Sequence, residues 1–430
     1  MATGQQFTDW SAAYKLFKNK RMDIGGLFDV ARQKVLSLLP SNERIVVHLD
    51  DTLIRKRGKK ISGTSWKRDP LGPPFHTNFV WGQRFVQISA SVPQQPGCCQ
   101  VRAIPIDFHH SPSIKKPTRF SSEEEILNYK NNHSQATLSY QGATRIVELR
   151  KKLDDAGHQN KNLCISVDGS YTNHTVLKQL PVNTTLIGRI RKDTKLYSIP
   201  EVQPKVGRKK IYGEQLPTPE DIRKSVDYPE IRVEAWATGR IHNFKVKVIN
   251  NVRWRSAGKK HDLQLMIISP LGYRLNKKSR ILYRQPAYLI CTDNKLNTTQ
   301  LLQAYLWRWE IEVNFRDEKT LLGCGQAQVR GAEAVEKAPA FSVAMYSFLH
   351  LSSLLANQSR DQSVLPRPKW DPAKANQRLS TTEIMSLFRL QLWSKNIKNN
   401  FSGFVNKQHQ LRSHNNIADP LMSAAFYVRN

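Results

Sequence analysis

The chain has 430 residues and a formal net charge of +31, with 66 Lys and Arg against 35 Asp and Glu. The length allows two or three domains, and basic charge spread along the whole chain predicts a polyanion as partner, although a basic ribosome-associated protein has the same balance. Five cysteines without a CxxC pair argue against a disulfide framework and a zinc ribbon. Without a signal peptide pattern or an apolar run long enough for a bilayer, we expect a protein of the cytoplasm and no membrane partner.

The first 42 residues carry apolar side chains at helical spacing among Lys and Arg, which predicts a short helical segment that contacts DNA. Residues 44–52 (RIVVHLDDT) follow as a β-branched run that ends in two acids. This pattern predicts a buried strand that delivers a carboxylate to its end, whereas a turn starting at Asp51 is the alternative.

Residues 78–92 and 100–108 alternate in the way typical of strands and predict an antiparallel pair that forms a three-stranded meander with the first strand. A helix is predicted over residues 143–156, ending at Gly157. A second apolar strand, residues 162–168, ends at Asp168 before a glycine turn and a short helix. An acid at the carboxyl end of a strand is typical of functional sites in open α/β sheets, although Asp168 capping the helix is the alternative.

Residues 193–284 change character, because they are rich in turns and basic residues with three strand-like pieces at 231–236, 244–250 and 263–268. This predicts a β-rich insertion domain. Trp236 and Trp254 within it are candidates for stacking on an unpaired base, although packing inside a hairpin is the more common use of such residues.

Residues 285–292 return to strand character and lead into a segment that predicts one helix between a cap at Asn297 and a stop at Gly323. Four polar residues fall within one stripe of this helix, about 60° wide at ~100° per residue: Tyr305, Arg308, Glu312 and Lys319. Charged groups on a half-packed helix need partners, so an internal ladder of ion pairs is one reading. A carboxylate flanked by cations and a phenol also suits a phosphodiester held beside a divalent ion.

Beyond this helix, residues 339–355 predict an apolar core helix, and Ser380 with Glu383 predicts a capping box that opens a further helix. The remainder of the chain is basic and rich in Asn. These patterns divide the chain into residues 1–42, 43–192, 193–284, 285–358 and a basic helical region at 359–430.

The spacing Tyr305-x2-Arg308-x3-Glu312-x6-Lys319 resembles the Y-R-E-K signature of bacterial insertion-sequence transposases of the DDE type. The resemblance covers roughly residues 45–330. It implies a ribonuclease-H-like fold, a mixed α/β sheet flanked by helices, with the β-rich insertion between the second Asp and the Glu. It also implies that Glu312 is the third metal-binding carboxylate.

The two other carboxylates implied by the resemblance are the acid of the first strand and Asp168, which stands in a D-G-x-Y context. The first is Asp50, with Asp51 as the alternative, because a slip of one residue would exchange them. Three such acids suit two Mg2+ ions, which Mn2+ can replace. Tyr305, Arg308 and Lys319 would contact DNA phosphates.

The implied function is cleavage of double-stranded DNA at element ends and strand transfer into a target by a homodimer in a bacterial cytoplasm. Two alternatives remain: a ribonuclease-H-type nuclease or resolvase without strand transfer, and a DNA-binding relative that has lost activity.

Overall fold

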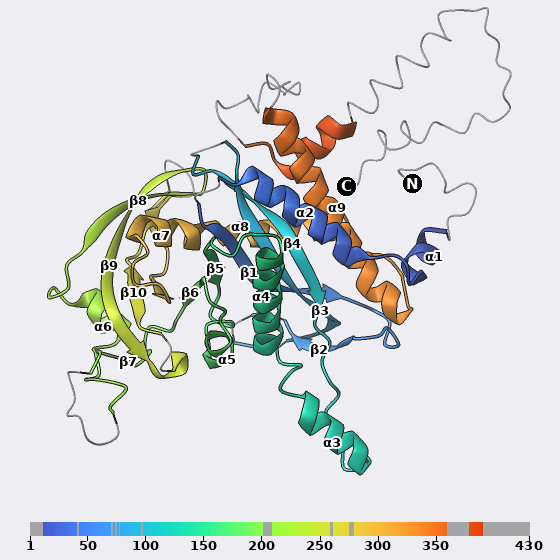
Figure 1. Cartoon of the computed structure of the whole chain (residues 1–430), viewed down its shortest axis with the longest axis horizontal. Coiled ribbons are helices and arrows are strands. Elements are labelled where there is room, and N and C mark those ends of the chain that lie inside the picture. Colours follow the sequence, from blue (N-terminus) through green and yellow to red (C-terminus); the bar gives the residue numbers. More distant parts are fainter. Residues whose placement is uncertain are drawn as a thin grey trace, which may run out of the picture. The chain divides into compact units, whose positions relative to one another are not determined.

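A computed structural model describes residues 12–40, 43–69, 72–73, 75–76, 78–95, 98–200, 209–258, 261–274, 279–358 and 378–389 (Figure 1). These residues belong to two compact units. The larger unit takes the described residues of 35–59 and 63–314, and the smaller takes those of 12–34, 60–62 and 315–389.

The larger unit is built on one mixed sheet, which among the described residues has eleven strands. They are β1 (Ile45–Arg55), β2 (Ser65–Arg68), β3 (Phe79–Pro93), β4 (Val101–His110), β5 (Leu163–Val167), β6 (Thr184–Arg189), β7 (Leu196–Tyr197), β8 (Ile231–Ala237), β9 (Arg240–Trp254), β10 (Leu263–Ile268) and β13 (Ala287–Cys291). The order is β2-β3-β1-β5-β6-β13-β10-β9-β7, with β4 on β3 and β8 on β9. The short strands β11 (Gly272–Tyr273) and β12 (Leu282–Tyr283) pair separately.

Three neighbouring strands in this sheet run parallel and give it the mixed character that the sequence predicts. In their register Leu49 of β1 pairs with Val167 of β5, and Val167 pairs with Gly188 of β6. The predicted meander is also confirmed, because β3 pairs antiparallel with both β1 and β4. β5 and β6 end at the same edge of the sheet, whereas β1 continues past Asp50 to Arg55. The prediction that this strand ends at its two acids is therefore wrong, and so is the alternative of a turn at Asp51, because the long strand β3 keeps pairing with β1 as far as Arg55.

Helices cover both faces of the sheet. On one face α7 (Thr298–Trp307) buries Leu301 and Leu302 in a cluster that includes Cys164 of β5, with Val46 of β1 packed against it. On the other face, Gly142 of α4 (Leu138–Asp155) lies against Leu49. Val46 and Leu49 are three residues apart in a strand, so their side chains point to opposite faces.

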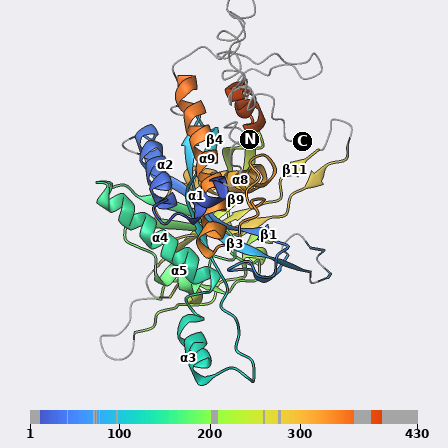
Figure 2. The ribbon, with the colours of Figure 1, turned by 90° about the vertical axis from the view of Figure 1, so that its right-hand side faces the viewer.

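The remaining helices of the larger unit are short. They are α3 (Glu123–Asn132), α5 (His174–Lys178), α6 (Pro219–Lys224) and the 3-10 turn η2 (Arg255–Ala257). In Figures 1 and 2, α3 extends away from the sheet, and it has no buried residues. Helix α3 was not predicted, although Ser122 and Glu125 form a complete capping box at its start.

The single helix predicted between Asn297 and Gly323 is wrong in one respect, because the chain forms α7 and then α8 (Trp309–Thr320), separated at Arg308. The N–H of Arg308 donates to the carbonyl of Tyr305, three residues back, at 3.2 Å, and the next turn repeats this shorter spacing. The predicted cap at Asn297 is confirmed, since its side chain accepts from the N–H of Thr299. Bonds from Trp307 and Arg308 to other strands and loops offset the lost helical geometry.

In the smaller unit, α1 (Ala12–Lys18) packs against α9 (Ala332–Gln358), with the rings of Phe17 and Phe341 centred 5.7 Å apart. The helix predicted from Pro339 begins seven residues earlier, because Ala334 and Val335 are buried against Phe17 and offset the hydrogen bond that the proline lacks. Residues 332–356 are long and apolar enough to cross a membrane, with a mean hydropathy of 1.3. The core helix of a globular protein can have the same length and composition.

The two other predicted helical regions are partly described. Helix α2 (Ile24–Leu38) follows α1, so the first part of the chain is helical, and its contact with DNA stays a prediction. Residues 381–389 form a helix that opens with the predicted capping box, in which Ser380 and Glu383 exchange bonds of 2.6 and 3.2 Å. The rest of the predicted region 359–430 lies outside the described residues.

Residues 193–284 supply β7 to β12, and β8, β9 and β10 extend the same sheet that carries β1 and β5. The described part of this segment belongs to the larger compact unit. Its boundaries as a separate insertion domain, like the other predicted boundaries, stay predictions.

Candidate active site

Two acids, Asp50 within β1 and Asp168 directly after β5, occupy neighbouring positions on two adjacent parallel strands. The last parallel pair of β1 and β5 is Leu49 with Val167, so the next residues on the two strands are Asp50 and Asp168. Burial first, and then the charge of Asp168, raise the pKa of Asp50 to about 7. A proton or a cation is therefore needed to keep this pair of acids together.

The cation at this position is Arg308, from the junction of α7 and α8. Its Nη1 lies 3.2 Å from Oδ2 of Asp50, and its Nη2 lies 3.1 Å from Oε1 of Glu312. The guanidinium is mostly buried, with 16% of the side chain exposed. One arginine therefore joins two acids that are 262 residues apart in the sequence, from the sheet and from a helix.

The backbone around Asp168 is held by its own turn. The N–H of Ser170 donates to Oδ1 of Asp168 at 2.9 Å, and Thr172 Oγ1 donates to the Asp168 carbonyl at 2.7 Å. Asn173 then caps α5, as a side chain that accepts from the N–H of Val176. Asp168 itself does not cap that helix, so the alternative reading of it as a helix cap is wrong.

Asp51 points to the other face of β1 and has a different set of partners. Tyr171 donates its hydroxyl to Oδ1 of Asp51 at 3.2 Å, and Arg84 Nε lies 3.3 Å from Oδ2. Burial raises the pKa of Asp51, and the charge of Arg84 opposes that shift. The same hydrogen bond and the burial of Tyr171 raise the pKa of its phenol. Asp51 is thus bound within a closed network.

His48 precedes these acids on the same face of β1 as Asp50. Its Nε2 lies 2.7 Å from Ser91 Oγ, and burial lowers its pKa to about 3, with the charge of Arg308 adding to the effect. A neutral histidine therefore lies two residues before Asp50, on the same face of β1.

Three residues near the acids were not predicted as site residues: His48, Arg84 and Tyr171. Tyr171 had a signal in the D-G-x-Y context of Asp168, whereas Arg84 lies in a strand without any motif.

The other predicted site residues lie at several places. Tyr305 is half-buried and packs against the apolar cluster beneath α7. Lys319 is in the last turn of α8, within the smaller unit, where its Nζ lies 6.0 Å from the centre of the Phe315 ring. Trp236 and Trp254 are half-buried in β8 and β9, and the backbone of Trp236 exchanges hydrogen bonds with the Gln303 side chain.

The acids supply the oxygen ligands that Mg2+ prefers, and the buried Asp50 beside Asp168 is a position that favours a positive charge. Within the described part of the chain, no three His, Cys, Asp or Glu side chains are gathered closely enough to hold a metal ion. Arg308 bonds to Asp50 and Glu312 where such an ion would bind. In this arrangement Asp50 and Glu312 are held by the guanidinium and are not gathered around a common point.

The sequence matches the family described as DDE superfamily endonuclease over residues 8–260, which is more than half of the chain. The match contains Asp50 and Asp168 and ends before Glu312. A comparison with curated proteins gives no match. The mixed sheet flanked by helices agrees with the fold expected of this family. The chain therefore belongs to the DDE superfamily endonucleases, and DNA is the substrate that this membership implies.

Proposed function

We propose that the chain is a metal-dependent transposase of an insertion sequence, which cleaves double-stranded DNA at the element ends and transfers the strands to target DNA. The observation that carries this proposal is the contact of Arg308 with both Asp50 and Glu312, beside Asp168. These are three residues of the expected acidic and basic set, brought together from separate elements.

We assign the metal-binding positions to Asp50, Asp168 and Glu312. The alternation of β1 supports Asp50 over Asp51, because Asp50 shares a face with His48 and contacts Arg308, whereas Asp51 is bound by Tyr171 and Arg84. Two Mg2+ ions, or Mn2+ in their place, would activate a water or a 3′-hydroxyl and stabilise the leaving oxygen.

We also propose that Arg308 contacts the scissile phosphate. If Asp50 and Glu312 held metal ions, the Arg308 guanidinium would be available to the non-bridging oxygens of the scissile phosphate, where negative charge would build up during attack. Tyr305 and Lys319 are proposed to contact neighbouring phosphates. A homodimer that brings two element ends together is the proposed assembly.

The test uses the full-length protein and a plasmid that carries the DNA flanking its gene as the candidate element ends. Asp50→Asn, Asp168→Asn and Glu312→Gln should each abolish cleavage in Mg2+ or Mn2+ while binding to the same DNA survives. Asp51→Asn is the matched control, because it removes the same charge one residue away. Full cleavage by the Asp168 or Glu312 variant would overturn the assignment.

A second assay separates the proposal from its alternatives. A labelled end with a free 3′-hydroxyl should become joined to an unrelated target plasmid. Cleavage without any joining would instead identify a nuclease or resolvase. Binding without cleavage in any divalent ion would identify an inactive relative.

A further inference from the structure

A pocket of about 890 Å3 opens beside the candidate active site, in the larger unit. Its wall includes Gly169 and Thr172, and Thr172 holds the carbonyl of Asp168 at 2.7 Å. Arg189, the last residue of β6, follows Gly188, which pairs with Val167 of β5. Asp50 within β1, Asp168 directly after β5 and Arg189 at the end of β6 therefore occupy neighbouring positions across three adjacent parallel strands, and the pocket begins at Arg189.

The acids that line the pocket are already paired. Asp193 accepts two hydrogen bonds of 3.1 Å from Arg191, and Glu220 accepts two of 2.8 Å from Arg223. Glu220 also accepts a hydrogen bond from the hydroxyl of Tyr288. The Arg223 bonds lower the pKa of Glu220 to about 2, so this acid stays ionised and matched. The pocket has no acid left to attract a cation.

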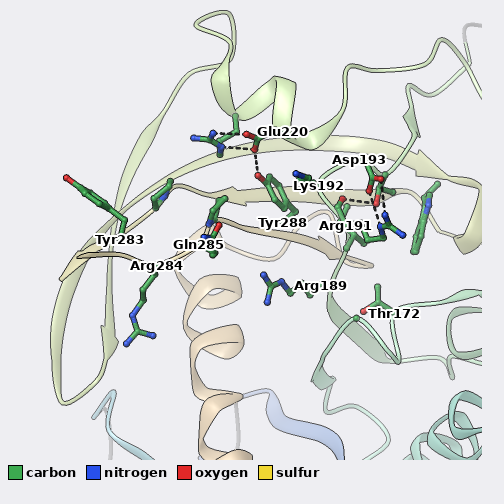
Figure 3. Close-up of a pocket in the computed structure, with 17 residues that line it drawn as sticks. Thr172, Arg189, Arg191, Lys192, Asp193, Glu220, Tyr283, Arg284, Gln285 and Tyr288 are labelled. Carbon is green, nitrogen blue, oxygen red and sulfur yellow. Dashed lines mark hydrogen bonds and ion pairs between the residues drawn. The ribbon is translucent and has the colours of Figure 1, made fainter. Parts of the chain in front are cut away.

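Three basic residues of the same pocket remain: Arg189, Lys192 and Arg284. In the part of the chain that the structure describes, none of them pairs with a carboxylate, and all three are exposed. Figure 3 shows Arg189 and Arg284 extending to the side opposite Glu220. The Arg284 guanidinium lies 5.4 Å from the centre of the Tyr273 ring, which leaves its donors available. The pocket therefore carries an excess of positive charge.

The size of the pocket selects among nucleic acid partners. A volume of 890 Å3 lies within the ~300–1,000 Å3 of pockets that enclose small ligands, a scale that suits single nucleotides rather than a length of double helix. An unpaired strand of a few nucleotides fits this space. Trp254 and the exposed Tyr283 line it as well, and aromatic rings among cations are the usual features of sites for single strands.

We propose that this pocket binds the backbone of an unpaired DNA strand that leaves the scissile phosphate, with Arg189, Lys192 and Arg284 each contacting a phosphate. The inference rests on the proposed function for the position of the scissile phosphate at Asp168. It adds a class of DNA, the unpaired strand, and three positioning residues that lie outside the acidic set and outside the four-residue stripe of α7 and α8. Arg189, nearest to Asp168 in the register, takes the first phosphate.

The test measures binding by fluorescence anisotropy, with EDTA present so that no DNA is cut. The probes are a labelled single-stranded oligonucleotide and the duplex of the same sequence. The triple variant Arg189→Gln, Lys192→Gln, Arg284→Gln should bind the single strand roughly 100-fold more weakly at 0.1 M salt, and the slope of log affinity against log salt should become shallower by about 2, since each phosphate contact contributes ~0.7. Duplex binding should change by less than tenfold.

A matched control removes three exposed lysines from other surfaces of the same unit, by Lys130→Gln, Lys151→Gln and Lys178→Gln. The net charge falls by the same amount, from +31 to +28 in both variants (31 − 3 = 28). The control should keep the single-strand affinity and the salt slope of the unmodified protein. Because all six residues are exposed, thermal unfolding should be unchanged in both variants.

Other outcomes overturn the proposal. Single-strand binding that survives in the pocket variant, or falls equally in the control, would show that the pocket does not hold the strand. Equal losses for single strand and duplex would overturn the choice of unpaired DNA. None of these results depends on cleavage, so the Asp168→Asn assay decides the proposed function separately.

Discussion

Asp50 and Asp51 are adjacent in β1, equally half-buried, and yet surrounded in different ways. Asp50 meets a cation that it shares with Glu312, on the face that α7 covers. Asp51 meets Tyr171 and Arg84 on the opposite face. The pKa of both carboxyls is raised mainly by burial, so burial does not distinguish them.

The difference lies in what else the partners can do. Arg308 joins two carboxylates of the proposed metal-binding set, and in the proposed function both would exchange it for a metal ion. The partners of Asp51 fix a buried tyrosine and an arginine of β3 within the fold. A carboxylate with exchangeable partners suits chemistry, and a carboxylate in a closed network suits stability. Four predictions test this contrast.

The largest effect is expected for Arg308→Gln, which should lower the cleavage rate by about 100-fold to 1,000-fold, the range for losing one preorganised charge at a reacting phosphate. Arg84→Gln removes the same charge from the other face and should lower cleavage by less than tenfold. Cleavage rates are compared at saturating DNA. An equal loss in a folded Arg84 variant would remove the contrast between the two faces.

The second effect is a pH dependence in the metal-free protein. The folded pKa of Asp50, about 7, lies above its ordinary value of 3.8, so the folded state loses stability as the pH rises from about 4 to about 7. Asp50→Asn removes this penalty, and its stability relative to the unmodified protein should rise over the same window. The gain is at most ~4 kcal/mol at ~1.4 kcal/mol per pKa unit, less the lost pair with Arg308.

Urea unfolding in EDTA at pH 5 and pH 8 measures this second effect. Asp155→Asn, at an exposed site at the end of α4, controls for the change in net charge. A difference between Asp50→Asn and the unmodified protein that is the same at both pH values would show that Asp50 does not titrate in this range.

A smaller effect is expected at Gly142 of α4. A Cβ there would lie 2.6 Å from two ring carbons of Tyr171, so Gly142→Ala should displace the ring that holds Asp51 and cost about 2 kcal/mol. Gly169→Ala is the control, since its nearest neighbour would be the Arg189 carbonyl at an ordinary 3.6 Å. Chemical denaturation measures both, and an unchanged stability for Gly142→Ala would mean that Tyr171 is not tightly packed.

The smallest effect is expected for Tyr171→Phe, which removes one hydrogen bond to Asp51 and should cost about 1 kcal/mol. Cleavage should stay within a few-fold of the unmodified protein. Tyr129→Phe on α3, a helix with no buried residues, is the matched control. A loss of cleavage comparable with that of Arg308→Gln would place Tyr171 in the chemistry and contradict the assignment of Asp51 to structure.

Local patterns predicted the strands well. The runs before Asp50 and Asp168 are β-branched and apolar because both segments lie in the buried centre of the sheet, and β10 occupies the predicted residues 263–268. The sequence did not predict that β1 continues beyond the acids to Arg55. The same patterns do not give strand order, so β13 between β6 and β10 was not predicted in that place. Order depends on pairings between segments far apart in the sequence.

The predicted helix that carries Arg308 and Glu312 shows where local patterns are insufficient. Periodicity predicted one continuous helix from Asn297 to Gly323, yet the chain is irregular at Arg308, and Trp309 directly after it is 60% exposed. The contacts that offset the lost helical geometry are made with Cys99 and Asp50, which are distant in the sequence and therefore give no local pattern. The partners Arg84 and Arg189 were missed for the same reason. Residue types and spacing singled out Asp50, Glu312 and the arginine that joins them, whereas Arg84 and Arg189 lie near the site only through tertiary contacts.

The place of β13 has a consequence for synthesis of the protein. Until residues 287–291 have left the ribosome, the parallel strands β1, β5 and β6 have no bonded link to β10 and β9, because β13 alone joins β6 to β10. The nascent chain then holds two half-sheets with open edges. Strand β13 is synthesised shortly before Arg308 and Glu312. A growing chain therefore acquires the strand that joins the two parts of the sheet and the residue Glu312 almost together. A product truncated before residue 287 would carry Asp50 and Asp168 on a sheet in which β6 and β10 are not joined, and it would lack both Arg308 and Glu312.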